Sequence, residues 1–395
     1  ATYQSAVAAA LPLALAGFAG SITQILRDVP CSFSSAQRMT ETAMNQRPGP
    51  TTFQAAAQEP GLDSGLTPAG LQRTASLRAR RLLVAGLNLA TLAALLYGLS
   101  HVLAAGGWSL VDIVIFVAFL FGAPWTVLGF WNAAIGLWLL HGVEDGIERV
   151  APFAAAGDEA TPLAIRTAIL MTLRNEDPAR AFRRLAIVKQ SLDATGQGAW
   201  FDYFVLSDTN DAAVAEAEEE LAAAFAATIG DASRLTYRRR TDNAGYKAGN
   251  VRDFCERWGD RYELMLPLDA DSVMSGDAIV KLTRMMQAWP KLGILQSLVV
   301  GMPSKSAFAR IFQFGMRHGM RPYTMGSAWW IGDCGPFWGH NAMVRIAPFR
   351  DACHLPVLPG GPPLGGHVMS HDQVEATLMR RAGYEVRVLP EENGS

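Results

Sequence analysis

Two carboxylates stand two positions apart in the run Asp269-Ala270-Asp271. Carboxylate oxygens are the ligands that hard divalent cations such as Mg²⁺ and Mn²⁺ prefer. A cation held there can neutralise the charge that develops on a departing diphosphate. A pair with this spacing is common by chance, but here it directly follows residues 262–268, an apolar run typical of a strand. The sequence therefore predicts that Asp269 and Asp271 form a metal site.

A second candidate for diphosphate binding opens a predicted helix at Lys247-Ala248-Gly249-Asn250. Backbone N–H groups at a helix N-terminus attract anions, and the ammonium group of Lys247 adds a full positive charge. Three arginines at positions 238–240 precede this segment and are compatible with a solvated strand edge or an RNA-binding patch. Because no aromatic residues are interleaved with them, we predict no nucleic-acid partner.

Polar residues also follow the first two predicted strands. Asn175 and Glu176 can accept hydrogen bonds from a base or a ribose, whereas the next residue, Asp177, precedes a proline and is typical of a helix N-cap. Asp208 follows the second strand in the same way. Capping and nucleotide binding both remain open for Asp208.

Two segments near the C-terminus could serve an acceptor sugar. Trp338, His340 and Asn341 combine an aromatic ring with hydrogen-bonding side chains, which suits stacking on a sugar, although a packed tryptophan beside a structural glycine fits equally well. His371 and Asp372 open the last predicted helix. Asp372 could cap that helix or take the proton from an acceptor hydroxyl, and His371 could be its hydrogen-bond partner or a metal ligand.

Alternating short apolar runs and amphipathic stretches must position these side chains. Strands are predicted at 164–171, 201–206, 235–237, 262–268 and 293–300, and helices at 178–191, 213–227, 247–258, 277–289 and 372–382. This alternation favours a doubly wound α/β sheet. Ligands of such sheets bind beyond the carboxyl ends of the strands, so we expect the residues that follow the strands to share one crevice.

Two apolar runs precede this domain. Residues 82–104 and 111–140 are long enough to cross the hydrocarbon core of a membrane. A single segment can do so only as a helix, because a helix satisfies the hydrogen bonds of its own backbone. Two buried helices of a soluble protein are the alternative. Arginines stand before the first run, at positions 73, 78, 80 and 81, so that side is predicted to be cytoplasmic and the chain returns to the cytoplasm by about residue 142.

The domain boundaries follow from these patterns. We expect an N-terminal apolar helix and linker at 1–70, two transmembrane helices at 71–141, a membrane-proximal linker at 142–161 and the α/β domain at 162–395. Residues 1–26 favour a helix lying on the membrane or packed on the protein over a spanning one.

The net charge of −2 indicates no polyanionic partner. The four cysteines lack a C-x-x-C pair, which favours reduced thiols over a zinc site or a disulfide framework.

Taken together, the candidate residues resemble the inverting family 2 glycosyltransferases with a GT-A fold, as in cellulose and hyaluronan synthases. The ordered set is Asn175-Glu176, Asp208, Lys247-Ala248-Gly249-Asn250, Asp269-Ala270-Asp271 and His371-Asp372. Longer strings are similar to those of the glucans biosynthesis glucosyltransferase H family, which are bacterial inner-membrane enzymes. These strings are Tyr237-Arg238-Arg239-Arg240, Leu268-Asp269-Ala270-Asp271-Ser272-Val273-Met274, Trp338-Gly339-His340-Asn341-Ala342, Ser370-His371-Asp372 and Met379-Arg380-Arg381-Ala382-Gly383.

The resemblance implies a metal-dependent, processive enzyme that transfers glucose from UDP-glucose to a growing β-1,2-linked glucan. Carried over by position, the resemblance implies that the uridine is bound by Asn175, Glu176 and Asp208. The phosphates or ribose would be bound by Lys247 and Asn250, and Asp269 would also contact the nucleotide. Asp269 and Asp271 would hold Mg²⁺ or Mn²⁺, and Asp372 would be the catalytic base. Implied partners are UDP-glucose, a glucan acceptor, the lipid bilayer and acyl carrier protein.

The family also has an Arg-Arg-Trp-type acceptor motif and further membrane spans shortly after the position that corresponds to residue 395. Relative to the family, the chain therefore looks truncated at its C-terminus. The alternative functions are another processive family 2 glycosyltransferase, similar to cellulose or hyaluronan synthase, and a non-catalytic membrane scaffold on the same fold.

Overall fold

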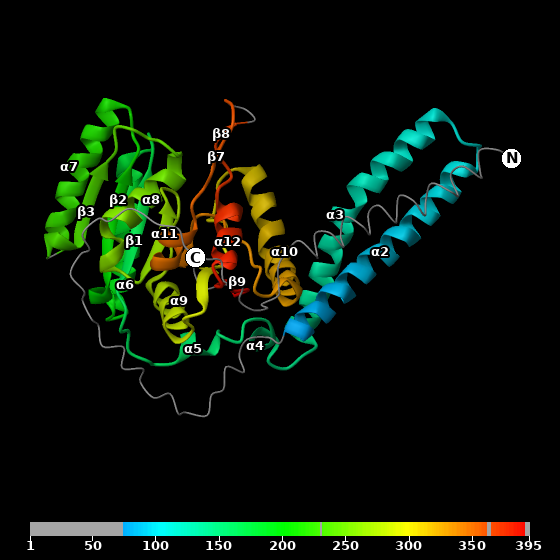
Figure 1. Ribbon diagram of the computed structural model, residues 1–395, viewed down its shortest axis with the longest axis horizontal. Coiled ribbons are helices and arrows are strands. Elements are labelled where there is room, and N and C mark those ends of the chain that lie inside the picture. Colours follow the sequence, from blue (N-terminus) through cyan, green and yellow to red (C-terminus); the bar gives the residue numbers. More distant parts are fainter. Residues whose placement is uncertain (1–73, 230, 362–364, 392–395) are drawn as a thin grey trace, which may run out of the picture. The chain divides into compact units, whose positions relative to one another are not determined.

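The structure is a computed structural model, and it describes residues 74–229, 231–361 and 365–391. The helix and linker predicted for residues 1–70 lie outside this range. The first described elements are two long helices, α2 (Thr74–Ala104) and α3 (Leu110–His141), which form a hairpin (Figure 1). Both are long and apolar enough to cross a membrane by length and composition. Large apolar side chains stay exposed along them, with Phe121 80% and Trp125 76% exposed.

Seven strands form one sheet in the order β3-β2-β1-β4-β6-β5-β9. The strands are β1 (Thr167–Leu173), β2 (Phe201–Ser207), β3 (Leu235–Arg239), β4 (Leu264–Asp269), β5 (Leu292–Gln296), β6 (Ala342–Arg345) and β9 (Glu385–Val388). All pairs are parallel except those made by β6, which runs antiparallel to both β4 and β5. The predicted doubly wound α/β class, preceded by two long apolar helices, is confirmed.

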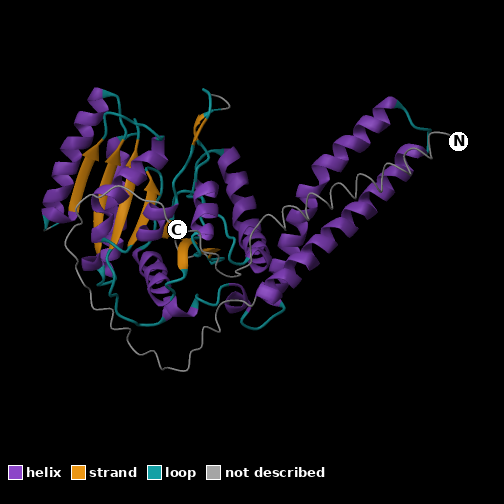
Figure 2. Ribbon diagram, in the orientation of Figure 1, coloured by secondary structure: helices purple, strands orange, loops and turns teal. Residues whose placement is uncertain are grey.

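Helices cover both faces of the sheet (Figure 2). They are α6 (Pro178–Ala194), α7 (Ala212–Thr228), α8 (Tyr246–Trp258), α9 (Gly276–Ala288), α11 (Ile346–Ala352) and α12 (Asp372–Arg381), with short helices α4 (Gly146–Val150) and α5 (Ala155–Asp158) ahead of the first strand. Alternate residues of β1 enter different cores: Ile169 and Met171 pack with α6 and α9, whereas Ala168 and Leu170 pack with α8 and α12. Burial on both faces explains why the strand is a continuous apolar run.

Helix α10 (Ala307–Ile331) has no counterpart among the predicted helices. Three glycines and Pro322 lie inside it, and both residue types lower helix propensity. Tertiary contacts stabilise it instead. Arg80 and Arg81 of α2 donate to the carbonyl groups of Trp329, Trp330 and Ile331, which end the helix without intrahelical partners. Cations at this end also complement the helix dipole.

The second half of α10 crosses α3 with backbone in contact with backbone. A Cβ atom built on Gly136 of α3 would lie 1.8 Å from the carbonyl oxygen of Pro322, and one on Gly326 of α10 would lie 1.9 Å from that of Asn132. Only glycine fits at either position, because any side chain would push the helices apart. This crossing joins the apolar hairpin to the α/β domain.

We predict that Gly136→Ala lowers the melting temperature of the detergent-solubilised protein. Overpacking of this kind costs about 1–3 kcal/mol. The matched control is Gly122→Ala on the same helix, where nothing lies within 4 Å of the added atom. It should leave stability unchanged or slightly raised, since alanine is the better helix former. Equal melting temperatures of the two variants would contradict the close crossing.

Candidate active site

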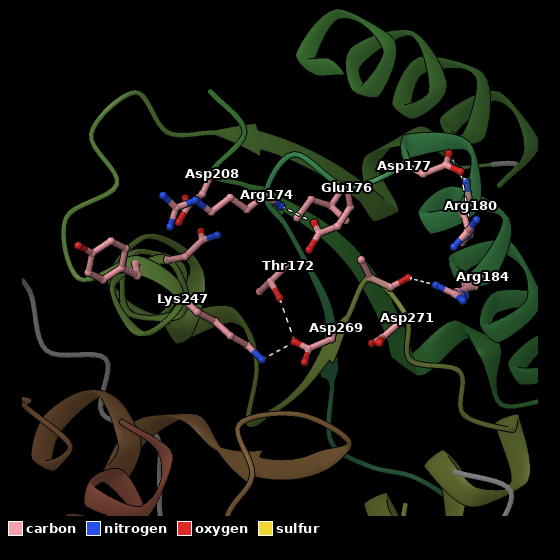
Figure 3. Close-up of a pocket in the computed structure, with 14 residues that line it drawn as sticks. Thr172, Arg174, Glu176, Asp177, Arg180, Arg184, Asp208, Lys247, Asp269 and Asp271 are labelled. Carbon is pink, nitrogen blue, oxygen red and sulfur yellow. Dashed lines mark hydrogen bonds and ion pairs between the residues drawn. The ribbon is translucent and has the colours of Figure 1, made fainter. Parts of the chain in front are cut away.

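A cleft of about 470 Å³ lies beyond the carboxyl ends of β1, β2 and β4 (Figure 3). Residues from several separate segments line it: Thr172, Leu173, Arg174, Glu176, Asp177, Arg180, Arg184, Asp208, Tyr246, Lys247, Asn250, Asp269, Ala270 and Asp271. The crevice expected from the strand pattern is therefore present, and six of the predicted donor and metal residues line it.

Asp269 is the last residue of β4, and the sheet register sets Thr172 of β1 directly beside it. The hydroxyl of Thr172 lies 3.5 Å from Oδ1 of Asp269, and the same oxygen accepts a hydrogen bond from Nζ of Lys247. Figure 3 shows Lys247 reaching from α8 across the cleft toward this carboxylate. Both side chains remain partly exposed, so a ligand can reach the pair.

Asp271 is exposed on the Arg184 side of the cleft (Figure 3). Arg184 donates to the carbonyl oxygen of Ala270 at 2.7 Å, and this bond fixes the turn between the two carboxylates. Arg180 and Arg184 are four residues apart on α6 and so share one helix face. Within the described residues, no group of three or more His, Cys, Asp or Glu side chains is arranged to hold a metal ion. Any cation here would need further oxygen ligands besides Asp269 and Asp271.

The start of α8 has an unusual backbone. Gly245 and Tyr246 both have positive φ, 72° and 51°, and this conformation is rare for a bulky residue. A Cβ on Gly249 would lie 2.0 Å from the carbonyl oxygen of Ala244, so this position also requires glycine. The bend brings the ring of Tyr246 to the cleft, with the guanidinium of Arg174 5.5 Å from the ring centroid. An aromatic surface beside a cation suits a nucleotide base.

Two predicted donor residues are engaged in buried internal bonds. Asp208, 3% exposed, accepts two hydrogen bonds from Arg240, at 2.7 and 2.6 Å. Asn250, 1% exposed, donates to the carbonyl of Leu206 and accepts from Arg238. Both line the cleft, and both also fix the segments that carry Lys247.

Asn175 and Glu176 differ in position although they are adjacent. The side chain of Asn175 binds the backbone N–H groups of Asn210 and Asp211, so it fixes the loop after β2, and it is not among the residues lining the cleft. Glu176 lines the cleft, where burial and the nearby carboxylates, chiefly Asp269, raise its pKa above the usual range. A hydrogen bond from the backbone N–H of Arg174 opposes this rise. Burial, assisted by the negative charge in the cleft, thus disfavours the ionised form of Glu176.

The acceptor-side candidates lie between the antiparallel strand β6 and the cleft. Nε2 of His340 is 3.9 Å from Oδ2 of Asp269, and its Nδ1 is 3.0 Å from the side-chain oxygen of Asn341. Asn341 is 2% exposed, and its carbonyl accepts a hydrogen bond from Ser297. The backbone N–H of Trp338 donates to Gln296. His340 is therefore the member of this trio that faces the predicted metal site.

Asp372 begins α12 close to Lys247. Gly339 has a φ of +76°, and a Cβ built on it would lie 3.7 Å from Cβ of Asp372, 3.7 Å from Cε1 of His371 and 3.8 Å from Nζ of Lys247. These three side chains thus surround one point beside the Lys247–Asp269 pair. The hydrogen-bond partner of the His371 ring is Glu375, not Asp372.

Sequence reasoning missed several cleft residues, among them Thr172, Arg174, Arg180, Arg184 and Tyr246. The four-residue spacing of Arg180 and Arg184 was a visible signal for two cations on one helix face. Nothing local marked Tyr246, because its position depends on the left-handed backbone that precedes α8.

Comparison with known proteins bears on the nature of this site. No family model matches the chain. It is 38% identical over 352 residues to the glucans biosynthesis glucosyltransferase H of Shewanella sp. (strain ANA-3), covering 89% of this chain and 47% of that protein. The protein of the same name from Xanthomonas campestris is 39% identical over 345 residues, covering 86% of this chain and 52% of the relative. The chain thus spans about half the length of the curated relatives it matches.

Solved structures with partial similarity are also glycosyltransferases. The mannosyltransferase PcManGT from Pyrobaculum calidifontis, solved with GDP-Man and Mn²⁺, is 15% identical with a TM-score of 0.37, covering 65% of this chain and 66% of that one. Mannosyl-3-phosphoglycerate synthase from Rubrobacter xylanophilus is 12% identical with a TM-score of 0.34, covering 60% and 68%. The sequence homologues confirm the predicted resemblance to the glucans biosynthesis glucosyltransferase H family.

We predict that Arg240→Ala destabilises the protein by about 3 kcal/mol or more, because it leaves the buried carboxylate of Asp208 without its partner. Urea or thermal unfolding measures this. Arg252→Ala is the control, since Arg252 forms an exposed pair with Glu256 and its loss should cost under about 0.5 kcal/mol. A similar small effect in both variants would mean that Asp208 does not depend on Arg240.

Proposed function

Because the chain is homologous over most of its length to glucans biosynthesis glucosyltransferases H, we propose that it binds UDP-glucose and transfers glucose to a growing β-1,2-linked glucan. The observation that carries this proposal is the cleft at the end of β4. There the Lys247 ammonium contacts Asp269, and Asp271 is exposed two residues further on. A cation and two carboxylates at one strand end suit a diphosphate bound together with a divalent metal.

The residues fit a divalent cation. Both carboxylates offer hard oxygen ligands, and Mg²⁺ is commonly bound through one or two carboxylates with substrate phosphates completing the shell. We propose that Asp269 and Asp271 hold Mg²⁺ or Mn²⁺, which when bound supplies charge neutralisation for the leaving diphosphate. Lys247, Arg180 and Arg184 add positive charge along the same cleft. The ring of Tyr246 and the guanidinium of Arg174, which also line the cleft, suit the nucleotide base.

In the proposed reaction Asp372 acts as the base beside the bound donor. As proposed base, its carboxylate takes the proton of the attacking acceptor hydroxyl. The hydroxyl oxygen forms a bond to the anomeric carbon of glucose, and the bond from that carbon to the phosphate oxygen breaks, so UDP leaves with the electron pair. The carboxylate stays fixed, because Oδ1 of Asp372 accepts hydrogen bonds from the N–H of Gln373 and the hydroxyl of Ser370.

A bilayer location is supported by the two long apolar helices. Arg80 and Arg81 lie near the N-terminal end of α2 and bind the α/β domain directly, so the basic end of the hairpin and the cleft would share one side of the membrane. By the positive-inside rule that side is the cytoplasm, here of a bacterial inner membrane. The acyl carrier protein interaction rests on the resemblance alone.

We predict that UDP with Mn²⁺ raises the melting temperature. A ligand at a hundredfold excess over its Kd stabilises by about 2.7 kcal/mol. Asp271→Asn should lose the metal-dependent part of this increase. The control is Asp260→Asn. The side chain of Asp260 is 87% exposed, and this residue lies before β4, at the opposite end of the strand from Asp269. If the melting temperature of Asp271→Asn still showed the full metal-dependent increase, the assignment of Asp271 to the metal site would be wrong.

Glucosyl transfer should fall about 10²–10⁴-fold in Asp372→Asn while the UDP-dependent increase in melting temperature persists, because a base acts on the acceptor and not on donor binding. The readout is radiolabelled glucan formed by membranes that contain the protein. Linkage analysis of that glucan tests the product. Loss of UDP binding in this variant would contradict the role of base, and β-1,4 bonds would contradict the proposed glucan.

A further inference from the structure

His371 is held in one orientation by a buried carboxylate. Its Nδ1 is 2.9 Å from Oε2 of Glu375, one helical turn later on α12, and Glu375 is only 3% exposed. Burial raises the pKa of Glu375, while the His371 hydrogen bond acts in the opposite direction. When Glu375 accepts this hydrogen bond, Nδ1 of His371 carries the ring proton, and the contact fixes the ring in that orientation. The lone pair of Nε2 is then available to accept a hydrogen bond.

The side of this ring that carries Cε1 borders the space beside Asp372 and Lys247. Cε1, the atom that joins Nδ1 to Nε2, lies 3.7 Å from the position a Cβ would take on Gly339, and Asp372 and Lys247 surround the same position. Among the described residues, Nδ1 of His371 is bound by Glu375 and no hydrogen bond to Nε2 is present. Gly339 adds no side chain to this space, and its φ of +76° disfavours any other residue.

Two side chains with hydrogen-bond acceptors, Asp372 and His371, therefore border the same point at the start of α12. A sugar presents hydroxyls on neighbouring carbons, and each hydroxyl has one proton to donate. One acceptor group can bind the attacking hydroxyl while the other binds its neighbour. Two such bonds fix the rotation of the acceptor sugar about the attacking oxygen, which a single carboxylate cannot do.

We propose that His371, oriented by Glu375, binds the acceptor hydroxyl adjacent to the attacking one and so determines which oxygen of the acceptor reacts. The proposal rests on the proposed glucosyl transfer. Asp372 still takes the proton of the attacking oxygen, and His371 keeps its own proton on Nδ1 throughout, so no further proton transfer is required. His371 is in this sense a specificity-determining residue, and Glu375 is a positioning residue that acts through it.

Two substitutions separate the two ring nitrogens. In His371→Asn the amide can replace the Nδ1 donor to Glu375, but nothing reaches the position of Nε2. In His371→Gln the longer side chain brings an amide oxygen toward that position. If the ring only stabilises α12 through Glu375, the Asn variant should be the milder one. If Nε2 binds the acceptor, the Gln variant should be the milder one.

The experiment compares both variants with wild type, in membranes that contain the full protein, with UDP-glucose, Mn²⁺ and a short β-1,2-linked glucan. We expect kcat/KM for the acceptor to fall about tenfold in His371→Asn, as for one lost hydrogen bond of about 1.4 kcal/mol, and less in His371→Gln. The KM for UDP-glucose and the UDP-dependent increase in melting temperature should not change. In the Asn variant, the release of free glucose should rise relative to the transfer of glucose to the glucan. A share of the new glycosidic bonds should form at an oxygen of the acceptor sugar other than O2.

Wild-type values of acceptor kcat/KM and linkage in His371→Asn would overturn the proposal, and so would a larger loss in the Gln variant than in the Asn variant. Glu375→Gln, which keeps the size of the side chain, should give an intermediate loss with donor KM unchanged. A raised donor KM in these variants would also overturn it. A wild-type protein that binds UDP but transfers no glucose would overturn the proposed function itself, which distinguishes the two failures.

Discussion

The register between parallel strands β1, β2, β3 and β4 sets the positions of the cleft residues at the strand ends. Thr172 is paired with Asp269 across β1 and β4, and Leu173 with Ser207 across β1 and β2. All four strands therefore end at one edge, where the chain must turn and can no longer bury apolar side chains on both faces. The turns that follow carry Glu176, Asp208 and Asp271. A shift of one residue in β4 would turn Asp269 to the other face of the sheet and separate it from Lys247.

Burial separates the carboxylates that hold the fold from those that can meet a ligand. Asp202, 4% exposed at the start of β2, is bound by Arg166, Arg234 and Tyr262, far along the strand from the cleft. Glu218 is fully buried and accepts hydrogen bonds from Thr209 and Tyr237. Buried carboxyl groups of this kind need hydrogen-bond partners. Asp269 and Asp271 remain accessible at the cleft, which is the condition for exchanging protein contacts for a metal or a phosphate.

The apolar hairpin and the proposed base are connected through one group of charges. Arg81 of α2 forms an ion pair with Asp333, which also pairs with Arg380 of α12. Asp372 and His371 begin that same helix. The two arginines bind different oxygens of Asp333, so this one carboxylate links α2 to α12. If the hairpin lies in a bilayer, as we propose, the acceptor side of the cleft is anchored to the membrane by this group.

From the sequence alone, the first five strands, β1 to β5, the helices between them and the two apolar helices were predictable, because apolar periodicity is a local property that folding preserves. Strands β6 and β9 were not predicted. The same pattern identified the strand ends, and with them Asp269, Asp271 and Asp208. Helix α10 was not predictable, since its glycines and Pro322 lower helix propensity and its stability comes from contacts with α3 and with Arg80 and Arg81. The sequence also could not show that Asp208 is hydrogen-bonded to Arg240 or that His371 is hydrogen-bonded to Glu375. Nor could it show that Asp372 and Lys247 lie close together around Gly339. Each of these contacts is between side chains whose directions are set only when the strands pair and the helices pack.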